Sequence, residues 1–312
     1  MADLPKRSLG VLGPEVSVIG LGCNNFGRRV DLEGTRAVVD AALDQGITFL
    51  DTSNTYGDPR GQSEEFLGQV LQGRRARVVL ATKFGMDMGD GLGPRGSRGY
   101  ILQAVEASLR RLRTDVIDYY WYHQPDGVTP IAETLETLDG LVNAGTVRWI
   151  GASNFSAEQI EEADAVARDR GFARFTSIQN NYSLLVRDAE REVLPTCERL
   201  GLGFVPFFPL ASGLLTGKYR RGESAPAGTR LAGRDQVATD EQFSLVEALS
   251  EYAAAREVSL IDVAIGALLA RRVVSTVIAG ATKPEQVDQN TAAARWQPSD
   301  RDLNELRELL NR

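Results

Sequence analysis

The chain has 312 residues, of which 43% are hydrophobic and 25% are charged, and this composition excludes a disordered, collagen-like or disulfide-scaffold protein. Its net charge of -7 disfavours a basic surface for the phosphates of nucleic acid, so we expect no nucleic-acid partner. A single histidine, His123, excludes a metal centre built from several histidines, and we expect no metal.

In chain order, short apolar runs alternate with longer amphipathic segments. Residues 7–18 predict a small hairpin that turns at Gly13-Pro14. The apolar runs predict strands at 16–21, 47–50, 78–82, 116–122, 147–151, 176–179, 203–207 and 274–278. The amphipathic segments predict helices at 33–44, 63–71, 100–112, 131–143, 157–168, 188–199, 242–256, 260–271 and 300–310.

The predicted strands are almost continuously apolar, which is typical of a parallel sheet covered by helices. Eight such strands alternating with helices favour a closed (β/α)8 barrel, a TIM barrel, over an open doubly wound sheet. No linker rich in Pro, Gly and Ser interrupts the pattern. We therefore expect one α/β barrel domain over residues 1–312, with an N-terminal β-hairpin across the bottom of the barrel and extra helices near the C-terminus.

Neither a signal peptide nor a membrane helix is predicted. Residues 1–10 are polar, and no apolar run approaches the roughly 20 residues that cross a membrane. The two cysteines, Cys23 and Cys197, lie far apart in the sequence, as expected for free thiols in a reducing compartment. These features predict a cytoplasmic protein without membrane contact.

Two long loops, 85–99 and 219–240, follow the third and seventh predicted strands. Both therefore lie at the end of the barrel where such folds place their active sites. Residues 91–96 satisfy the spacing GxGxxG, but a dinucleotide fingerprint needs a strand directly before it and a helix that opens inside it. Pro94 fits that role poorly, so we interpret this segment as a lid or substrate loop.

Four side chains with acid-base chemistry follow three neighbouring predicted strands. Asp51 comes after the second strand, with Tyr56 five positions later, and Lys83 and His123 follow the third and fourth strands. Taken alone, each of these residue types more often has a structural role. An aspartate can cap a turn, a lysine can extend into solvent, a tyrosine can pack its ring, and a histidine can lie in the core. Adjacent strands of one barrel bring all four to the same patch, which favours a functional role.

The chemistry of these four residues fits a reaction at a carbonyl group. A tyrosine has a pKa near 10, and a neighbouring ammonium lowers that pKa because it favours the phenolate. A carboxylate would hold the lysine in place, and a neutral imidazole would orient a carbonyl oxygen. The set therefore suits proton transfer during the addition of hydride, and it requires a hydride donor.

With these residues, the chain resembles the aldo-keto reductase superfamily from Gly20 to Asn290, nearest its bacterial and potassium-channel β-subunit-like branch. The stretches Asp51-Thr52-Ser53-Asn54-Thr55-Tyr56-Gly57 and Ala81-Thr82-Lys83-Phe84-Gly85 carry the likeness. The resemblance implies a catalytic tetrad, which consists of Asp51, Tyr56, Lys83 and His123. It also implies that Tyr56 is the general acid in reduction and the general base in oxidation, while His123 positions the carbonyl.

The resemblance further implies a nicotinamide cofactor that lies across the barrel mouth without a Rossmann fold. Ser153, Asn154 and Gln179 match the family's partners of the nicotinamide carboxamide, and Phe207 replaces a tyrosine or tryptophan that stacks on the ring. The loop over residues 207–218 matches the segment that binds the pyrophosphate. The implied cofactor-binding residues are Gly22, Ser153, Asn154, Gln179, Phe207, Pro209, Leu210, Ser212, Gly213, Leu215, Lys218, Arg230, Gly280, Thr282, Lys283, Gln286 and Asn290.

The segment after the eighth predicted strand matches the region that binds the adenosine 2′-phosphate and the adenine. Asn290 matches the adenine-binding asparagine of the family. Gly280 and Gln286 stand where many of its reductases carry a lysine and an arginine, so Thr282 and Lys283 are the expected partners of the phosphate. These matches favour NADPH and leave NADH possible.

Three functions compete. The first is an NAD(P)H-dependent oxidoreductase that reduces aldehydes or ketones to alcohols reversibly, with a small carbonyl or alcohol molecule as its partner. The second is a cofactor-sensing regulatory or interaction subunit with little turnover, as among the channel β subunits. The third is a phosphate-binding barrel isomerase or lyase, which Ser153, Asn154 and Gln179 disfavour. The substrate, the physiological direction and the choice between monomer and homo-oligomer stay open.

Overall fold

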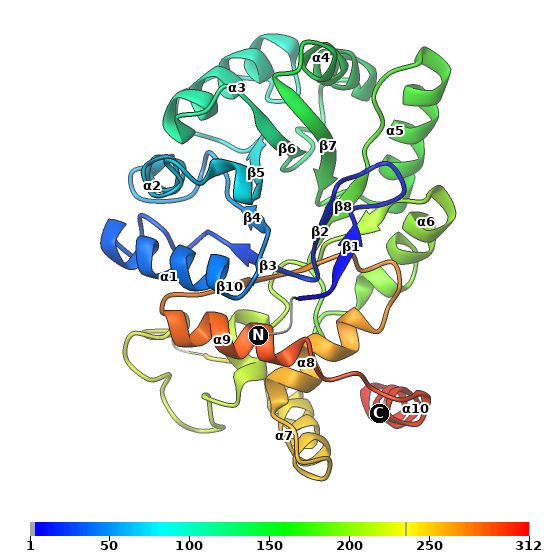
Figure 1. The fold of residues 1–312 in the computed structure, drawn as a ribbon. Helices are drawn as coiled ribbons and strands as arrows, with labels where there is room; N and C mark the ends of the chain where they lie inside the picture. Colours follow the sequence, from blue (N-terminus) through cyan, green and yellow to red (C-terminus); the bar gives the residue numbers. More distant parts are fainter. Residues whose placement is uncertain (1–3, 235, 312) are drawn as a thin grey trace.

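Eight parallel strands form one curved sheet, in the order β10-β3-β4-β5-β6-β7-β8-β9, in a computed structural model that describes residues 4–234 and 236–311 (Figure 1). The strands are β3 (Ile19–Gly22), β4 (Phe49–Asp51), β5 (Val79–Phe84), β6 (Ile117–Tyr122), β7 (Val147–Ser153), β8 (Ser177–Gln179), β9 (Gly203–Phe204) and β10 (Val277–Gly280). The backbone N–H of Phe204 donates to the carbonyl of Val273 at 2.7 Å, and Ser275 donates to Phe204 at 3.0 Å. These bonds join the two edges of the sheet, which confirms the predicted barrel.

Helices surround the barrel and separate its strands along the chain (Figure 1). They are α1 (Leu32–Asp44), α2 (Gln62–Val70), α3 (Arg98–Leu112), α4 (Ile131–Asn143), α5 (Ala157–Arg170), α6 (Val193–Leu200), α7 (Asp240–Ala254), α8 (Leu260–Leu269), α9 (Pro284–Ala293) and α10 (Asp300–Leu310). The helix predicted over 188–199 is divided into a 3-10 turn, Asp188–Glu190, and α6. The prediction missed α9, because Asn290 and Thr291 lie on its buried face and break the apolar periodicity.

The predicted N-terminal hairpin is present as β1 (Lys6–Ser8) paired antiparallel with β2 (Glu15–Ser17). Leu9 and Val16 are fully buried and belong to the cluster of side chains inside the barrel. Trp121 belongs to this interior cluster as well. The hairpin therefore closes the end of the barrel opposite the C-terminal ends of the strands, as predicted.

Local signals fix where α5 begins and ends. Ser156 accepts a hydrogen bond from the backbone of Gln159, and the Gln159 side chain bonds back to Ser156, which forms a capping box. Gly171 ends the helix in the left-handed conformation, with φ of 70°. The cap at Ser156 follows the end of β7, where the predicted cofactor residues Ser153 and Asn154 lie.

Both long loops emerge at the carboxyl ends of strands, β5 and β9. The GxGxxG spacing at 91–96 lies in the first loop, away from β5, and α3 begins only at Arg98 with Ser97 as its N-cap. The segment therefore lacks the strand-turn-helix geometry of a dinucleotide fingerprint. Position 235 of the second loop, like residues 1–3 and 312 of the expected domain, lies outside the described residues.

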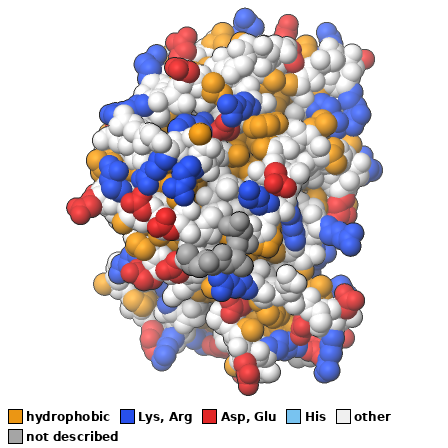
Figure 2. Space-filling model, in the orientation of Figure 1, with side chains coloured by type: hydrophobic (Ala, Val, Ile, Leu, Met, Phe, Trp, Pro, Cys, Tyr) orange, Lys and Arg blue, Asp and Glu red, His pale blue; other side chains and the backbone are white. Residues whose placement is uncertain are grey.

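In the orientation of Figure 1, Lys and Arg side chains are interspersed with Asp and Glu (Figure 2). No helix in the described part of the chain has the length and apolarity needed to cross a membrane. Within residues 4–234 and 236–311, no group of at least three His, Cys, Asp and Glu side chains is arranged to hold a metal ion.

Candidate active site

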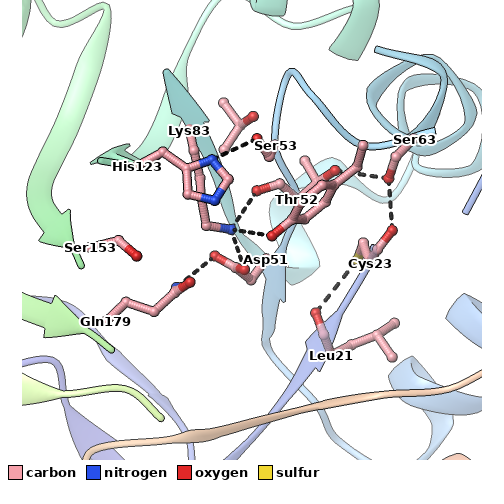
Figure 3. Close-up of polar contacts among 12 residues, drawn as sticks. Leu21, Cys23, Asp51, Thr52, Ser53, Ser63, Lys83, His123, Ser153 and Gln179 are labelled. Carbon is pink, nitrogen blue, oxygen red and sulfur yellow. Dashed lines mark hydrogen bonds and ion pairs between the residues drawn. The ribbon is translucent and has the colours of Figure 1, made fainter. Parts of the chain in front are cut away.

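The acid-base residues predicted from the strand ends lie together at one end of the barrel. Asp51 is the last residue of β4, Lys83 is the next to last of β5, and His123 follows β6 directly. These strands are neighbours in the sheet, and Figure 3 shows their three side chains directed toward one region. Tyr56 reaches the same region from the loop between β4 and α2.

Lys83 is the centre of the polar contacts in this cluster. Its side chain is fully buried and forms an ion pair and hydrogen bond with Asp51. Its Nζ also donates to the carbonyl of Thr52 at 2.8 Å and to the Tyr56 hydroxyl at 3.5 Å. Burial lowers the pKa of Lys83, but the charge of Asp51 and the contact with Tyr56 outweigh burial and raise it. Lys83 is therefore a fixed cation.

The pKa of Tyr56 differs from the sequence expectation. We expected the ammonium to lower the pKa of this phenol below its ordinary value. Burial instead raises the pKa of Tyr56, and the lowering effect of Lys83 is too small to reverse it. The phenol is thus protonated at neutral pH, which suits a proton donor, and the depressed pKa that we predicted was wrong.

His123 is held as a neutral imidazole. Burial, followed by the nearby charge of Lys83, lowers the pKa of His123 well below its ordinary value. Its backbone N–H donates to the carbonyl of Phe84 at 2.7 Å, and the Nδ2 of Asn154 donates to its carbonyl at 2.9 Å. The rings of His123 and Tyr56 are nearly perpendicular, with centroids 6.0 Å apart. A neutral ring in this place can donate a hydrogen bond to a ligand oxygen.

A cavity of about 1040 Å³ opens beside these residues. Asp51, Tyr56 and His123 line it, whereas Lys83 lies behind them and is fully buried. Most of the predicted cofactor residues also line it: Gly22, Asn154, Gln179, Phe207, Pro209, Leu210, Ser212, Gly213, Lys218, Arg230, Gly280, Thr282, Lys283, Gln286 and Asn290. The structure therefore brings these residues from six segments of the chain to one cavity.

Ser153, Asn154 and Gln179 form a connected group at the ends of β7 and β8. Ser153 pairs with Gln179 in the parallel register, and the backbone N–H of Asn154 donates to the Gln179 carbonyl at 3.1 Å. The Nε2 of Gln179 donates to Asp51 at 3.1 Å (Figure 3). Ser153 is 1% exposed and lies behind the cavity wall. The group thus joins the predicted carboxamide site to the acid-base cluster.

The loop after β9 has an unusual backbone. Ala211, Ser212 and Gly213 all have positive φ, at 45°, 58° and 97°. A Cβ on Gly213 would lie 2.8 Å from the Nζ of Lys218, so the missing side chain lets the ammonium approach this backbone. Successive left-handed residues form a concavity that favours anions. Leu215 lies apart from it, since its side chain is fully buried in a separate core cluster.

The segment after β10 brings a helix terminus to the cavity. Lys283 is the residue that precedes α9, and it lines the cavity with Thr282 and Asn290. Gln286 accepts hydrogen bonds from the backbone and hydroxyl of Thr282, at 2.7 and 3.1 Å. The amino end of a helix carries a partial positive charge, so this wall also favours an anion.

Sequence reasoning missed several wall residues. Thr55, Met86, Gln124 and Phe208 line the cavity beside the predicted site residues. Met86 and Gln124 follow Lys83 and His123 closely in the sequence. Their positions just beyond a strand end could therefore have indicated that they line the cavity. Arg28 and Arg29 line it too, from the loop between β3 and α1.

A parallel barrel with a carboxylate, an ammonium, a phenol and an imidazole clustered at its mouth has the architecture of a barrel enzyme with an acid-base site. The model of the aldo/keto reductase family matches residues 18–311. The chain therefore belongs to the aldo/keto reductase family.

Three relatives show the breadth of this likeness. A probable voltage-gated potassium channel subunit beta of Oryza sativa subsp. japonica is 35% identical over 301 residues, which are 92% of this chain and 90% of that protein. The uncharacterized oxidoreductase YrpG of Bacillus subtilis is 39% identical over 289 residues, which are 89% and 87% of the two chains. The L-glyceraldehyde 3-phosphate reductase of Escherichia coli is 33% identical over 304 residues, which are 93% and 88%. The family and its oxidoreductase-named members support a carbonyl-reducing oxidoreductase.

Proposed function

We propose that this protein is an NADPH-dependent reductase that converts aldehydes or ketones to alcohols, with Tyr56 as the general acid. The contact of the Tyr56 hydroxyl with Lys83, beside His123 at the cavity wall, carries this proposal. Tyr56 donates its proton to the carbonyl oxygen as negative charge develops on that oxygen. Lys83 then stabilises the resulting phenolate. His123, neutral and held by its backbone, donates a hydrogen bond that orients the carbonyl.

The cavity fits the charge of a dinucleotide phosphate. Among the described residues, five cationic side chains line it and Asp51 is the one carboxylate, which is already paired with Lys83. This excess of positive charge contrasts with the net charge of -7 for the whole chain. The five cations are Arg28, Arg29, Lys218, Arg230 and Lys283.

The polar groups around the cavity match the parts of a nicotinamide cofactor. Asn154 and Gln179 would hold the carboxamide with Ser153, and Phe207 would stack on the ring. The left-handed turn at Ser212 and Gly213, with Lys218 against it, would hold the pyrophosphate. When bound, the cofactor supplies the hydride that the acid-base residues themselves lack.

The screen that tests this function measures the oxidation of NADPH and NADH with aldehydes, ketones, quinones and sugars. Turnover of at least one carbonyl compound, with an alcohol as product, is the expected result. The relative that reduces L-glyceraldehyde 3-phosphate makes phosphorylated aldehydes a useful arm of this screen. Binding of NADPH without turnover of any carbonyl would contradict the enzymatic function.

We expect Lys283→Ala to weaken NADPH binding about tenfold and to leave NADH binding nearly unchanged, since one charge-assisted contact is lost. Lys283 lies at the amino end of α9 and faces the cavity, where it would meet the 2′-phosphate that NADH lacks. Titration of each cofactor by tryptophan fluorescence measures both affinities. A matched loss of both affinities would exclude Lys283 as the partner of the 2′-phosphate.

The second candidate is a cofactor-sensing subunit that works through a partner protein. The likeness to the rice channel subunit over 92% of this chain supports it. The cluster around Lys83 favours turnover, because its Tyr56 and His123 side chains line the cavity, where they can act on a ligand. The same screen separates the two functions, since a sensing subunit would bind the cofactor and reduce carbonyl compounds poorly.

A further inference from the structure

The hydroxyl of Ser53 lies between the histidine ring and the backbone that leads to Tyr56. Its Oγ is 3.2 Å from the Nδ1 of His123, as Figure 3 shows. The same Oγ accepts a hydrogen bond from the backbone N–H of Thr55 at 3.2 Å and is 3.0 Å from the Thr55 hydroxyl. Ser53 is completely buried, so water does not compete for these contacts.

The ring of His123 depends on this contact for its orientation. The backbone of His123 is held on both sides, by Phe84 and by Asn154. These bonds do not fix the rotation of the imidazole about its side-chain torsions. Among the described residues, Ser53 is the one group with a hydrogen bond to a ring nitrogen.

The hydrogen-bonding capacity of a hydroxyl limits the possible directions of the bond between Ser53 and His123. A serine oxygen has two lone pairs and one proton. The Thr55 backbone N–H occupies one lone pair, so the proton and one lone pair remain for the Thr55 hydroxyl, which is 3.0 Å away, and for the Nδ1 of His123. When the Thr55 hydroxyl donates to the remaining lone pair, Ser53 has only its proton to offer to His123. Asn54 is a more distant acceptor for that proton, at 3.4 Å.

We propose that Ser53 is a positioning residue that donates to the Nδ1 of His123 and thereby keeps the imidazole proton on Nε2. Nε2 is on the opposite side of the ring from Ser53, and His123 lines the cavity. With the proton on Nε2, the ring can donate a hydrogen bond to a carbonyl oxygen in the cavity. The inference rests on the proposed function for its catalytic meaning, but the state of the ring can be measured without any substrate.

The single histidine of the chain makes the test direct. In protein labelled with ¹⁵N at histidine, a long-range proton-nitrogen spectrum of the NADPH complex contains the ring of His123 alone. The protonated and bare nitrogens have well-separated shifts, so the spectrum reports which nitrogen carries the proton. We expect the proton on Nε2 in the unmodified protein and a mixture of both forms in Ser53→Ala. A proton on Nδ1, or a Ser53→Ala spectrum like that of the unmodified protein, would overturn the proposal.

Kinetics and a matched control complete the experiment. Ser53→Ala should lower kcat/KM for the carbonyl substrate about tenfold, the loss expected for one hydrogen bond, without changing the Kd of NADPH. Ser53→Thr keeps the hydroxyl and should restore the Nε2 form. Ser63→Ala removes another fully buried hydroxyl from the same region without touching His123 and should leave the spectrum unchanged. An altered spectrum with unchanged kcat/KM would refute the catalytic part of the proposal.

The outcomes also separate this inference from the proposed function. A protein that reduces no carbonyl compound would refute the reductase function, yet its spectra would still decide whether Ser53 sets the ring proton. An active reductase with unchanged spectra in Ser53→Ala would refute the inference alone.

Discussion

Tyr56→Phe should lower kcat for carbonyl reduction about a thousandfold, within the range that general acids contribute. The substitution removes only the hydroxyl, which is the group of Tyr56 that accepts a hydrogen bond from Lys83. The aromatic ring remains, and its perpendicular packing against His123 remains with it. The loss should therefore appear in the chemical step. Single-turnover oxidation of NADPH measures this step, and fluorescence titration should give an unchanged Kd for the cofactor.

The control for this variant is Tyr100→Phe, which removes a hydroxyl that donates to the carbonyl of Met86 outside the acid-base cluster. Tyr100→Phe should retain most of its activity. Near-normal turnover in Tyr56→Phe would assign the acid to another group.

The direction of two pKa shifts predicts the pH dependence of the reaction. Burial raises the pKa of Tyr56, so the phenol keeps the proton that it donates throughout the neutral range. The pKa of His123 lies well below its usual value, so the ring stays neutral across the same range. We expect kcat for reduction to be level between about pH 7 and 9, whereas alcohol oxidation should rise with pH as phenolate forms. A reduction rate with a midpoint near neutrality would contradict both shifts.

Lys83→Met should destabilise the fold by about 3–5 kcal/mol, besides abolishing turnover. The ammonium is completely buried, and its removal leaves the carboxylate of Asp51 buried with only Gln179 and neutral groups around it. Breaking one side of a buried ion pair costs more than removing both sides, because a lone charge cannot be solvated. Urea unfolding, followed by circular dichroism, measures the loss.

The control is the double variant Asp51→Asn with Lys83→Met, which removes both charges. It should recover most of the stability and none of the activity, so the double-mutant cycle isolates the interaction between the two groups. A double variant no more stable than Lys83→Met would show that packing, and not charge, sets the cost.

Much of the fold could be predicted because helices and parallel strands leave periodic signals. The helix predicted over 131–143 has the same bounds in the structure. The helix α9 could not be predicted, because Asn290 faces its buried side for reasons that only the cavity explains. The signal for a strand at 203–207 was also too long, since β9 ends at Phe204 where the barrel closes.

The sequence by itself determined the identity and grouping of the candidate site residues. Asp51, Lys83 and His123 stand at the ends of consecutive strands, and parallel strands of one barrel must end at the same face. The direction of the pKa of Tyr56 was decided only by the tertiary structure, because burial competes with the charge of Lys83 and the sequence reports neither distance nor depth. The hydrogen bond between Ser53 and His123 was also decided only by the tertiary structure. A hydrogen bond between residues 70 positions apart depends on how two neighbouring loops are packed.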